Sequence, residues 1–381
     1  MTKRQRYAVG VGAASALGAL AVGVAKAGRG LSESMGGQPL GARLDRMRQS
    51  PQFSGGTFHN RAAGTSTIPS GQGDVLGRLI RGAELRKPPV EIPLVQGGSE
   101  AAEAIGLQVT WYGHASALVE LDGARILLDP VWSDRCSPSQ QVGPKRLHPV
   151  PCSLAELGRV DAVVISHDHY DHLDMDSIKE LAALGVGVFL VPLGVGAHLE
   201  RWGVPEERIV ERDWDEGFDI AGVRVTAVEA QHFSGRGLRR DGTLWASWVI
   251  AGESGRVFFS GDTGYFDGYP GIAQAYGPFD VALMAVGAYD PSWPTIHLNP
   301  EEAVEAAIDL GSPLVLPIHW CTFSLAPHPW AEPVERLLAA AGEAGVPVVI
   351  PRVGEQVDIA APPAHDAWWS PASAVESADV A

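Results

Sequence analysis

The sequence predicts a layered α/β fold, with sheets and helices in one domain that spans residues 106–360. Short apolar, β-branched runs begin at Leu107 and alternate with segments of helical periodicity. Asp122-Gly123 and Ser254-Gly255 have the composition of tight hairpin turns. Capping residues mark helix boundaries between the runs. Because both element types are present, we expect layers of sheet and helix, and not an all-β barrel or an all-α bundle.

The apolar runs set the predicted strands, which cover residues 107–112, 116–121, 124–128, 161–166, 187–191, 223–229, 244–250, 256–260, 280–285, 314–318 and 347–350. Helices are predicted at 175–184, 194–202, 300–310 and 331–343. Asp174 is the expected N-cap of the first helix, and Gly185 follows its end. Asn299 is the expected N-cap of the third helix, with Pro300 at its first position.

Both ends of the chain are predicted to lie outside this domain. A basic start precedes an uncharged run at 7–25 and an Ala25-Lys26-Ala27 sequence, so residues 1–27 are predicted to be a signal peptide or a membrane anchor. The protein is therefore expected to be exported or associated with a membrane. Residues 28–105 are predicted to be a linker and irregular covering segment, with a short helix starting at 75–80. Residues 361–381 are predicted to be a flexible tail.

The composition narrows the classes of partner. The chain has 381 residues, of which 45% are hydrophobic and 19% charged, with a net charge of −16. This acidic balance excludes nucleic-acid binding through a general basic surface, which needs many cations to neutralise phosphates. An anionic substrate would require local positive charge, and bound metal ions could supply it.

The most informative segment is His167-Asp168-His169-Tyr170-Asp171-His172, which directly follows the predicted strand 161–166. Such a dense group of imidazoles and carboxylates is costly to bury without partners. Neutral imidazole and carboxylate are, however, the usual ligands of zinc and similar divalent ions. In a tight loop, His167 and His169 can point to one ion while Asp171 and His172 reach a second ion about 3.5–4 Å away.

Three distant residues occupy equivalent positions. His232, Asp262 and His319 each follow an apolar run, and the carboxyl ends of strands are where ligands gather in open sheets. Any one of these residues taken alone is more often an ordinary core or surface side chain. Together with the segment His167–His172, however, they make four separate segments that each carry potential ligands directly after a strand. This combination predicts metal binding.

These residues form an H-x-H-x-D-H motif, a later histidine, a Gly-Asp-Thr-Gly turn and a final histidine, and the pattern resembles the metallo-β-lactamase superfamily. The resemblance implies a four-layer αβ/βα sandwich with two metal ions at one edge. His167, His169 and His232 would hold the first ion, and Asp171, His172 and His319 the second. Asp262 would bridge them. Zinc is the expected metal, although iron and manganese also suit these ligands.

A narrower resemblance lies in the flanking segments. They are similar to the N-acyl-phosphatidylethanolamine phospholipase D family in the stretches WYGHA (111–115), DPVWSDRCSPSQQVGPKRLHPVPC (129–152), PFDVALMAVGAYDP (278–291), HLNPEEAV (297–304) and IHWCTF (318–323). Gln141 and Phe233 stand where the mammalian enzyme has Tyr and Trp. That relative implies a homodimer for this chain.

Metal-site chemistry and local charge assign roles to side chains, and the resemblance adds that of His297. The catalytic set is Asp171, which orients the attacking hydroxide, Asp262, which holds the metal separation, and His297, which donates to a phosphate oxygen or the leaving group. The expected substrate contacts are His297, Gln140, Gln141, Lys145, Arg146 and Tyr289. His114 is expected to be structural or to support a ligand.

We therefore expect a two-metal hydrolase that cleaves a phosphodiester, in a phospholipid such as N-acyl-phosphatidylethanolamine and at a membrane surface. The first alternative is a hydrolase of the same fold that acts on a soluble lactone or a phosphorylated metabolite. The second alternative is a non-catalytic metal-binding protein. A wide apolar groove that leads to the metals would favour a lipid substrate. A small polar pocket would favour a soluble substrate, and a closed site would favour the non-catalytic metal-binding protein.

Overall fold

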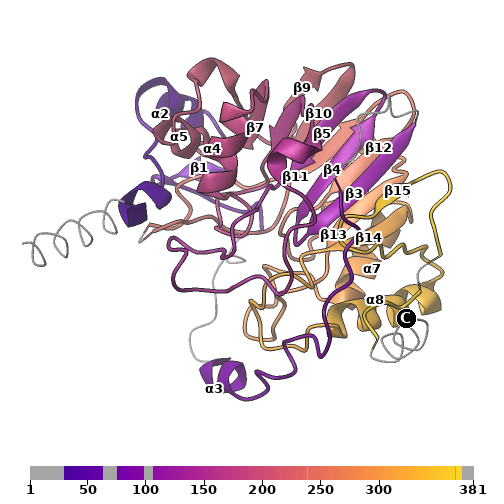
Figure 1. Ribbon diagram of the computed structural model, residues 1–381. Helices are drawn as coiled ribbons and strands as arrows, with labels where there is room; N and C mark the ends of the chain where they lie inside the picture. The colour runs from indigo at the N-terminus through magenta and orange to yellow at the C-terminus, as the bar shows by residue number, and fades with distance from the viewer. Residues whose placement is uncertain (1–29, 63–74, 98–105, 238, 365, 371–381) are drawn as a thin grey trace, which may run out of the picture.

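Two β-sheets face each other across a shared hydrophobic core in the computed structural model (Figure 1). The structure describes residues 30–62, 75–97, 106–237, 239–364 and 366–370. The predicted signal peptide or anchor at 1–27 lies outside the described residues. Among the described residues, no helix has the length and apolar character needed to cross a membrane.

The first sheet has seven strands. Their order is β15 (Gln356–Asp358), β3 (Leu107–Gly113), β4 (Ser116–Leu121), β5 (Ala124–Leu128), β6 (Ala162–Val164), β7 (Val188–Pro192) and β8 (Ile209–Arg212). Pairing is antiparallel from β15 to β5 and parallel from β5 to β8. Every residue of β4 and β5 is buried, because the core lies on one face of the sheet and helices on the other.

The second sheet has six strands. Their order is β14 (Leu314–Ile318), β13 (Val281–Ala285), β12 (Arg256–Phe259), β11 (Ser247–Ala251), β10 (Val223–Val228) and β9 (Gly217–Ile220). The strands β12, β13 and β14 run parallel to one another, and β9 to β12 pair antiparallel. The parallel arrangement brings the ends of β12, β13 and β14 to one edge of the sheet.

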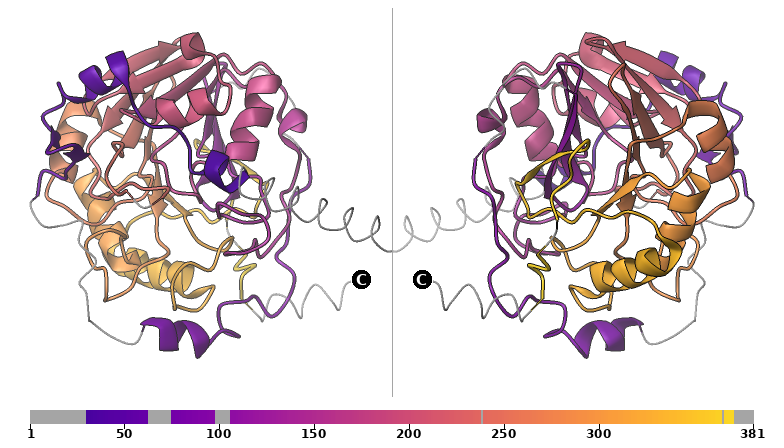
Figure 2. Two further views of the ribbon diagram at one scale, coloured as in Figure 1. Left: turned by 90° about the vertical axis from the view of Figure 1, so that its left-hand side faces the viewer. Right: turned by 90° about the vertical axis from the view of Figure 1, so that its right-hand side faces the viewer.

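Helices cover the outer face of each sheet (Figure 2). The helices α4 (Met175–Ala183) and α5 (Gly196–Arg201), with the 3₁₀ turns η1 (Leu154–Leu157) and η2 (Glu206–Arg208), lie along the first sheet. The helices α6 (Tyr269–Tyr276), α7 (Pro300–Asp309) and α8 (Glu332–Ala344) cover the second. The result is a four-layer αβ/βα sandwich, which confirms the predicted fold class.

Helix capping follows the sequence as predicted. The Asp174 side chain accepts a hydrogen bond from Ser177 N at the start of α4, and Gly185 follows its end with a φ of 90°. Asn299 caps α7 within a capping box, in which Glu302 bonds back to Asn299 N.

Part of the N-terminal region packs against this domain. It contains α2 (Gly41–Met47), the hairpin of β1 (Phe53–Ser54) and β2 (Thr57–Phe58), and α3 (Val75–Ile80). Met47 and Phe58 are 2% and 1% exposed and belong to the main core. The segment 30–62 therefore adds side chains to the core of the sandwich.

Two expectations need correction. The segment 347–350 forms no strand and makes one bridge, between Val348 and Val315, because Pro347 at its start and Pro351 just after its end cannot donate hydrogen bonds to a ladder. The boundary at residue 361 also places Trp368 and Trp369 in a flexible tail, whereas these side chains are 6% and 4% exposed. Trp368 stacks on Trp320 with ring centroids 5.5 Å apart. Residues 371–381 lie outside the described part of the chain.

Within the predicted domain, three strands and one α-helix were not expected, namely β8, β9, β15 and α6; in the predicted linker, α2 and the hairpin of β1 and β2 were not expected either. The three strands have at most four residues, and polar side chains interrupt their apolar pattern. Such short runs carry little periodicity, so they form because they extend sheets that are already in place.

Candidate metal centre

The potential ligands lie in loops that follow four different strands. The segment His167–His172 follows β6, His232 follows β10, Asp262 follows β12 and His319 follows β14. These strands belong to both sheets, and their ends meet at one edge of the sandwich. The fold therefore brings together the residues that the sequence placed at strand ends.

The first cluster joins His167, His169, His232 and Asp262, whose ligand atoms all lie within 4.8 Å of one another. His167 Nε2 is 2.7 Å from His169 Nδ1, which is 3.3 Å from His232 Nε2. Asp262 Oδ2 lies 3.8 Å from His232 Nε2. These are the residues expected to hold the first metal, with the expected bridging carboxylate beside them.

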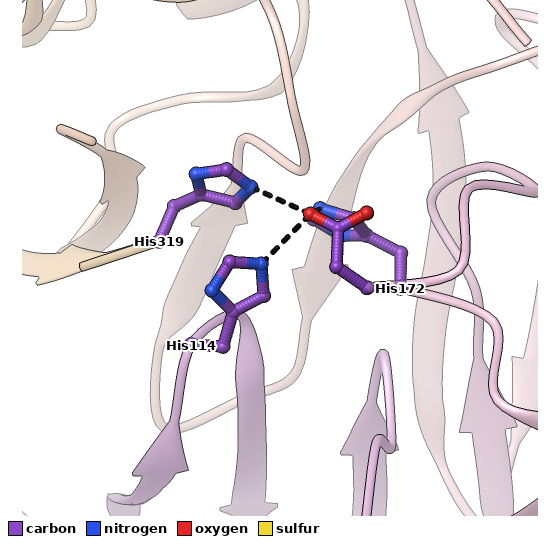
Figure 3. Close-up of side chains that lie close together, drawn as sticks. His114, His172 and His319 are labelled. Carbon is purple, nitrogen blue, oxygen red and sulfur yellow. Dashed lines mark hydrogen bonds and ion pairs between the residues drawn. The ribbon is translucent and has the colours of Figure 1, made fainter. Parts of the chain in front are cut away.

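The second cluster joins Asp171, His172 and His319 with His114, a residue outside the expected ligand set. Figure 3 shows the three imidazoles converging from separate elements. The carboxylate oxygen Oδ2 of Asp171 lies 2.9 Å from His114 Nε2 and 3.2 Å from His319 Nε2. His114 is therefore placed to donate a hydrogen bond that holds Asp171.

Asp262 lies between the two clusters. Its Oδ2 is 3.2 Å from His172 Nε2 and 4.0 Å from His167 Nε2, while Oδ1 is 3.1 Å from His319 Nε2. His297 Nδ1 approaches the same carboxylate at 3.7 Å. One carboxylate therefore contacts imidazoles of both clusters, as a bridging ligand would.

Outer hydrogen bonds fix the orientation of the imidazoles. His232 Nδ1 donates to the carbonyl oxygen of Ile296 at 2.8 Å, and His172 Nδ1 donates to Asp129 Oδ2 at 2.7 Å. Each bond places the proton on Nδ1 and turns Nε2 into the cluster. Asp129 was not among the expected site residues, although it follows β5 directly and so obeys the same strand-end pattern.

Backbone strain gathers at this edge. His114, Asp129 and His319 have φ angles of 51°, 37° and 65°, and each directly follows the last residue of a strand. This left-handed conformation costs non-glycine residues about 1–3 kcal/mol, and it persists where surrounding contacts impose it. The chain therefore turns sharply at these three strand ends, and that turn directs the side chains into the site.

The charge balance of the site favours a cation. Burial lowers the pKa of His167 and His232 well below the ordinary range, and lowers that of His114 to about 3. Burial also opposes charge on His172, but the carboxylates of Asp262 and Asp171 outweigh it and raise the pKa of this imidazole well above its usual value. The carboxylates of Asp171 and Asp262 thus depend on nearby positive charge, while most of the imidazoles are neutral and suited to ligation.

Several buried atoms of these residues also support the fit of metal ions. His172 Nε2, Asp262 Oδ1 and His297 Nδ1 are buried and make no well-aligned hydrogen bond with the residues that the structure describes, although the first two lie 3.2 and 3.1 Å from other residues of the site. Leaving such atoms unpaired costs about 1–3 kcal/mol each. The mixture of imidazole nitrogen and carboxylate oxygen in two adjoining groups therefore fits two divalent ions.

The centre opens on one side. The side chains of Asp171 and His297 are 14% and 13% exposed, whereas those of His172, His232 and His319 are 0% exposed. His297 also lines a cavity of about 730 Å³. The cavity wall contains aromatic, proline and charged residues, namely Arg78, Arg81, Gly82, Tyr289, Asp290, Pro291, Pro294, Asn299, Glu302, Pro327, His328, Pro329, Glu332 and Arg336.

Of the expected substrate contacts, Tyr289 and His297 line this cavity. The Tyr289 hydroxyl donates to Glu332 Oε1 at 2.6 Å, and its ring stacks on His328 with centroids 4.6 Å apart. Tyr289 therefore presents its ring and not a free hydroxyl.

The other four expected contacts do not line the cavity. Arg146 is buried, donates to the carbonyl oxygens of Ser133 and Val131, and lies over the ring of Phe323. The side chain of Gln140 bonds the backbone of Arg135 at both its oxygen and its nitrogen. Gln141 and Lys145 are exposed. In this loop, Gln140 and Arg146 therefore bond backbone groups of the protein.

Arg236, in the loop after His232, also uses its guanidinium within the protein. Arg236 is buried, donates to the carbonyl oxygens of Ser34, Asp168 and Leu173, and lies over the ring of Tyr170. The arginines at the cavity come instead from α3, the following turn and α8: Arg78, Arg81 and Arg336. No local motif marked them.

Comparisons with known proteins agree with this site. Residues 124–320, over half of the chain, match the model of the beta-lactamase superfamily domain. An uncharacterized protein of Mycobacterium tuberculosis is 48% identical over 92% of this chain and 98% of its own length. A UPF0173 metal-dependent hydrolase of Pyrobaculum neutrophilum is 31% identical over 58% of this chain and 86% of its own length.

Two further similarities concern the phospholipase family and the fold. The N-acyl-phosphatidylethanolamine-hydrolyzing phospholipase D 1 of Caenorhabditis elegans is 38% identical over 58% of this chain, and the match spans 65% of that enzyme. The solved structure of Igni18, a metallo hydrolase of Ignicoccus hospitalis, has a TM-score of 0.53 at 23% identity and covers 66% of this chain and 98% of that one. The second similarity concerns the fold alone. On its fold, its ligand clusters and these relatives, the chain belongs to the β-lactamase superfamily as a metal-dependent hydrolase.

Proposed function

We propose that this protein hydrolyses a phosphodiester bond in a phospholipid such as an N-acyl-phosphatidylethanolamine, releasing a product of the phosphatidic acid type. The main support is the cavity of about 730 Å³ that meets the metal centre at His297. A substrate in this cavity could place its phosphorus against the open side of the centre, between Asp171 and His297. The similarity to the C. elegans phospholipase supports the choice of substrate.

The roles of the side chains follow from their positions. Two bound divalent ions would lower the pKa of water and stabilise the charge on the phosphoryl oxygens. Asp171, on the open side, can accept a hydrogen bond from the attacking water and so orient it. His297 Nδ1 lacks a hydrogen-bond partner among the described residues and can donate to a phosphoryl or leaving-group oxygen. Asp262 contacts imidazoles of both clusters and so sets their separation.

The mouth of the cavity favours a lipid. Ile80 and Leu85 flank the lining residues Arg81 and Gly82, and their exposed fractions are 70% and 57%. Large apolar side chains beside an arginine suit the boundary between acyl chains and anionic head groups. We therefore propose that a membrane surface presents the substrate, and that the acyl chains stay outside a cavity of the size that usually holds small ligands.

A soluble lactone or phosphorylated metabolite is the second candidate. The cavity wall also contains the carboxylates of Asp290, Glu302 and Glu332, and Arg78 forms two hydrogen bonds with Asp290 at 2.7 and 2.8 Å. This polar lining supports a small substrate with its own hydrogen-bonding groups. The open side of the centre at Asp171 and His297 supports an enzyme, with either substrate, over a non-catalytic metal-binding protein.

The test compares zinc-loaded wild type and a His169→Ala variant on three substrates. These are vesicles that contain N-acyl-phosphatidylethanolamine, bis(p-nitrophenyl) phosphate and a soluble lactone. We expect the wild type to cleave the lipid most efficiently and the variant to lose activity because one ligand of the first cluster is missing. If the loaded wild type cleaves only the lactone, the phosphodiester proposal is wrong.

A double variant, Ile80→Ser with Leu85→Ser, tests the membrane contact. We expect lower activity on vesicles and unchanged activity on bis(p-nitrophenyl) phosphate. Leu184→Ser is the matched control, because Leu184 is 50% exposed at the end of α4 and lines none of the cavity. An equal loss of vesicle activity in the double variant and in the control would contradict a specific membrane contact at the mouth of the cavity.

A further inference from the structure

The N-terminal segment reaches the metal centre at Asn60. The side-chain amide of this residue forms a matched pair of hydrogen bonds with the backbone of His232, a residue of the first cluster. Asn60 Nδ2 donates to His232 O at 2.9 Å, and Asn60 Oδ1 accepts from His232 N at 3.1 Å. Trp245 Nε1 also donates to Oδ1, at 2.9 Å. Both ends of the amide are therefore used.

These two bonds satisfy the backbone of a buried ligand. His232 lies beyond the end of β10 at Val228, so no strand ladder pairs its N–H and C=O groups. His232 is 0% exposed, so water cannot serve as the hydrogen-bond partner of these backbone groups. The imidazole is held separately, by the bond from Nδ1 to Ile296 O. Asn60 thus supplies the backbone partners of His232 within the described part of the chain.

Contacts on either side hold Asn60 in place. The preceding Phe58 is 1% exposed in the core, and its N–H donates to Asp241 O at 2.8 Å. The following Arg61 pairs with Glu229 at 2.5 Å and lies 5.2 Å from the ring of Trp214. The amide therefore belongs to an anchored segment and is not a chance contact of a free arm.

We propose that Asn60 is a positioning residue of the metal centre, which acts through the backbone of His232. The segment 30–62, which precedes the matched superfamily domain at 124–320, is then part of the catalytic unit. The proposal requires only that the centre binds metal, and it holds for either candidate substrate.

The test measures zinc affinity by competition with a chelating dye, and the rise in melting temperature on zinc binding. We expect Asn60→Ala and Asn60→Asp to weaken binding of one zinc ion by about 10–100-fold, the usual effect of losing an outer-shell contact. The aspartate keeps the acceptor but turns an oxygen toward the carbonyl of His232. The zinc-induced rise in melting temperature should shrink in both variants.

Two controls separate positioning from general destabilisation. His59→Ala changes the adjacent exposed side chain, which bonds Thr57 and Ser54, and it should bind zinc as the wild type does. Met47→Ala removes core packing at α2 of the same segment, away from Asn60, so it should lower the melting temperature and retain zinc affinity. Wild-type affinity in either Asn60 variant, or an equal loss of zinc affinity in Met47→Ala, would overturn the proposal. Because no substrate is used, this result is independent of the proposed reaction.

Discussion

Asp129→Asn removes one negative charge from the wall of the metal centre at constant volume. Asp129 is 0% exposed and accepts three hydrogen bonds. Oδ1 accepts from Ser166 N at 2.7 Å, and Oδ2 accepts from Ser166 Oγ at 2.5 Å and from His172 Nδ1 at 2.7 Å. Asparagine tolerates the left-handed backbone of this position as well as aspartate does, so the change tests the carboxylate and not the turn.

An amide cannot reproduce this set of contacts in either orientation. With its oxygen toward His172, its NH₂ group faces the N–H of Ser166, and two donors meet. With its oxygen toward Ser166 N, its NH₂ group faces His172 Nδ1 and drives the imidazole proton to Nε2, the atom that faces the cluster. At least one hydrogen bond to a charged group is lost, which costs about 1.5–3 kcal/mol.

That free energy corresponds to a fall of roughly 10–100-fold in the affinity for one metal ion, as is usual for outer-shell changes. We expect zinc titration to show one weakened site, and kcat/KM to fall at limiting zinc and recover in part at high zinc. Asp122→Asn is the matched control. Asp122 has a φ of 51° and accepts backbone N–H groups of Glu253 and Ser254, but it lies in the turn between β4 and β5, at the opposite end of β5 from Asp129. Wild-type zinc affinity in Asp129→Asn would refute the reasoning.

Three further predictions concern other parts of the molecule. Burial, with a smaller effect of Arg146, lowers the pKa of His148 to about 4, below its value in the unfolded chain. The contribution of the neutral His148 ring to the free energy of unfolding is therefore complete above about pH 6.5 and is lost as the pH falls toward 4. His148→Asn should reduce that loss, by up to about 3 kcal/mol in urea unfolding of metal-free protein, and identical pH slopes would contradict this. His297→Gln should lower kcat/KM by about 10²-fold or more with full zinc content, whereas loss of zinc would make His297 a ligand instead. Ending the chain at residue 366 removes Trp368 and Trp369 and should cost at least about 3 kcal/mol in stability, and an unchanged melting temperature would mean that this end is a dispensable tail.

The sequence by itself determined the layered fold, most strand positions and the concentration of potential ligands. Strand and helix patterns are local, so β3, β4, β5 and α7 could be located from apolar runs and capping residues. The segment His167–His172 is dense enough to predict metal binding alone. His232, Asp262 and His319 could be added because residues after successive strands meet at one sheet edge.

Only the tertiary structure decided which side chains support these ligands and which face the substrate cavity. His114 was expected to be structural or to support a ligand, but its contact with Asp171 spans 57 residues and that of Asn60 with His232 spans 172, so neither pair could be read from a local pattern. The same holds for Arg146: it was an expected substrate contact, and only the structure shows that its guanidinium donates to the carbonyl groups of Ser133 and Val131. Long-range packing determines whether a polar group forms hydrogen bonds within the protein or can bind a ligand.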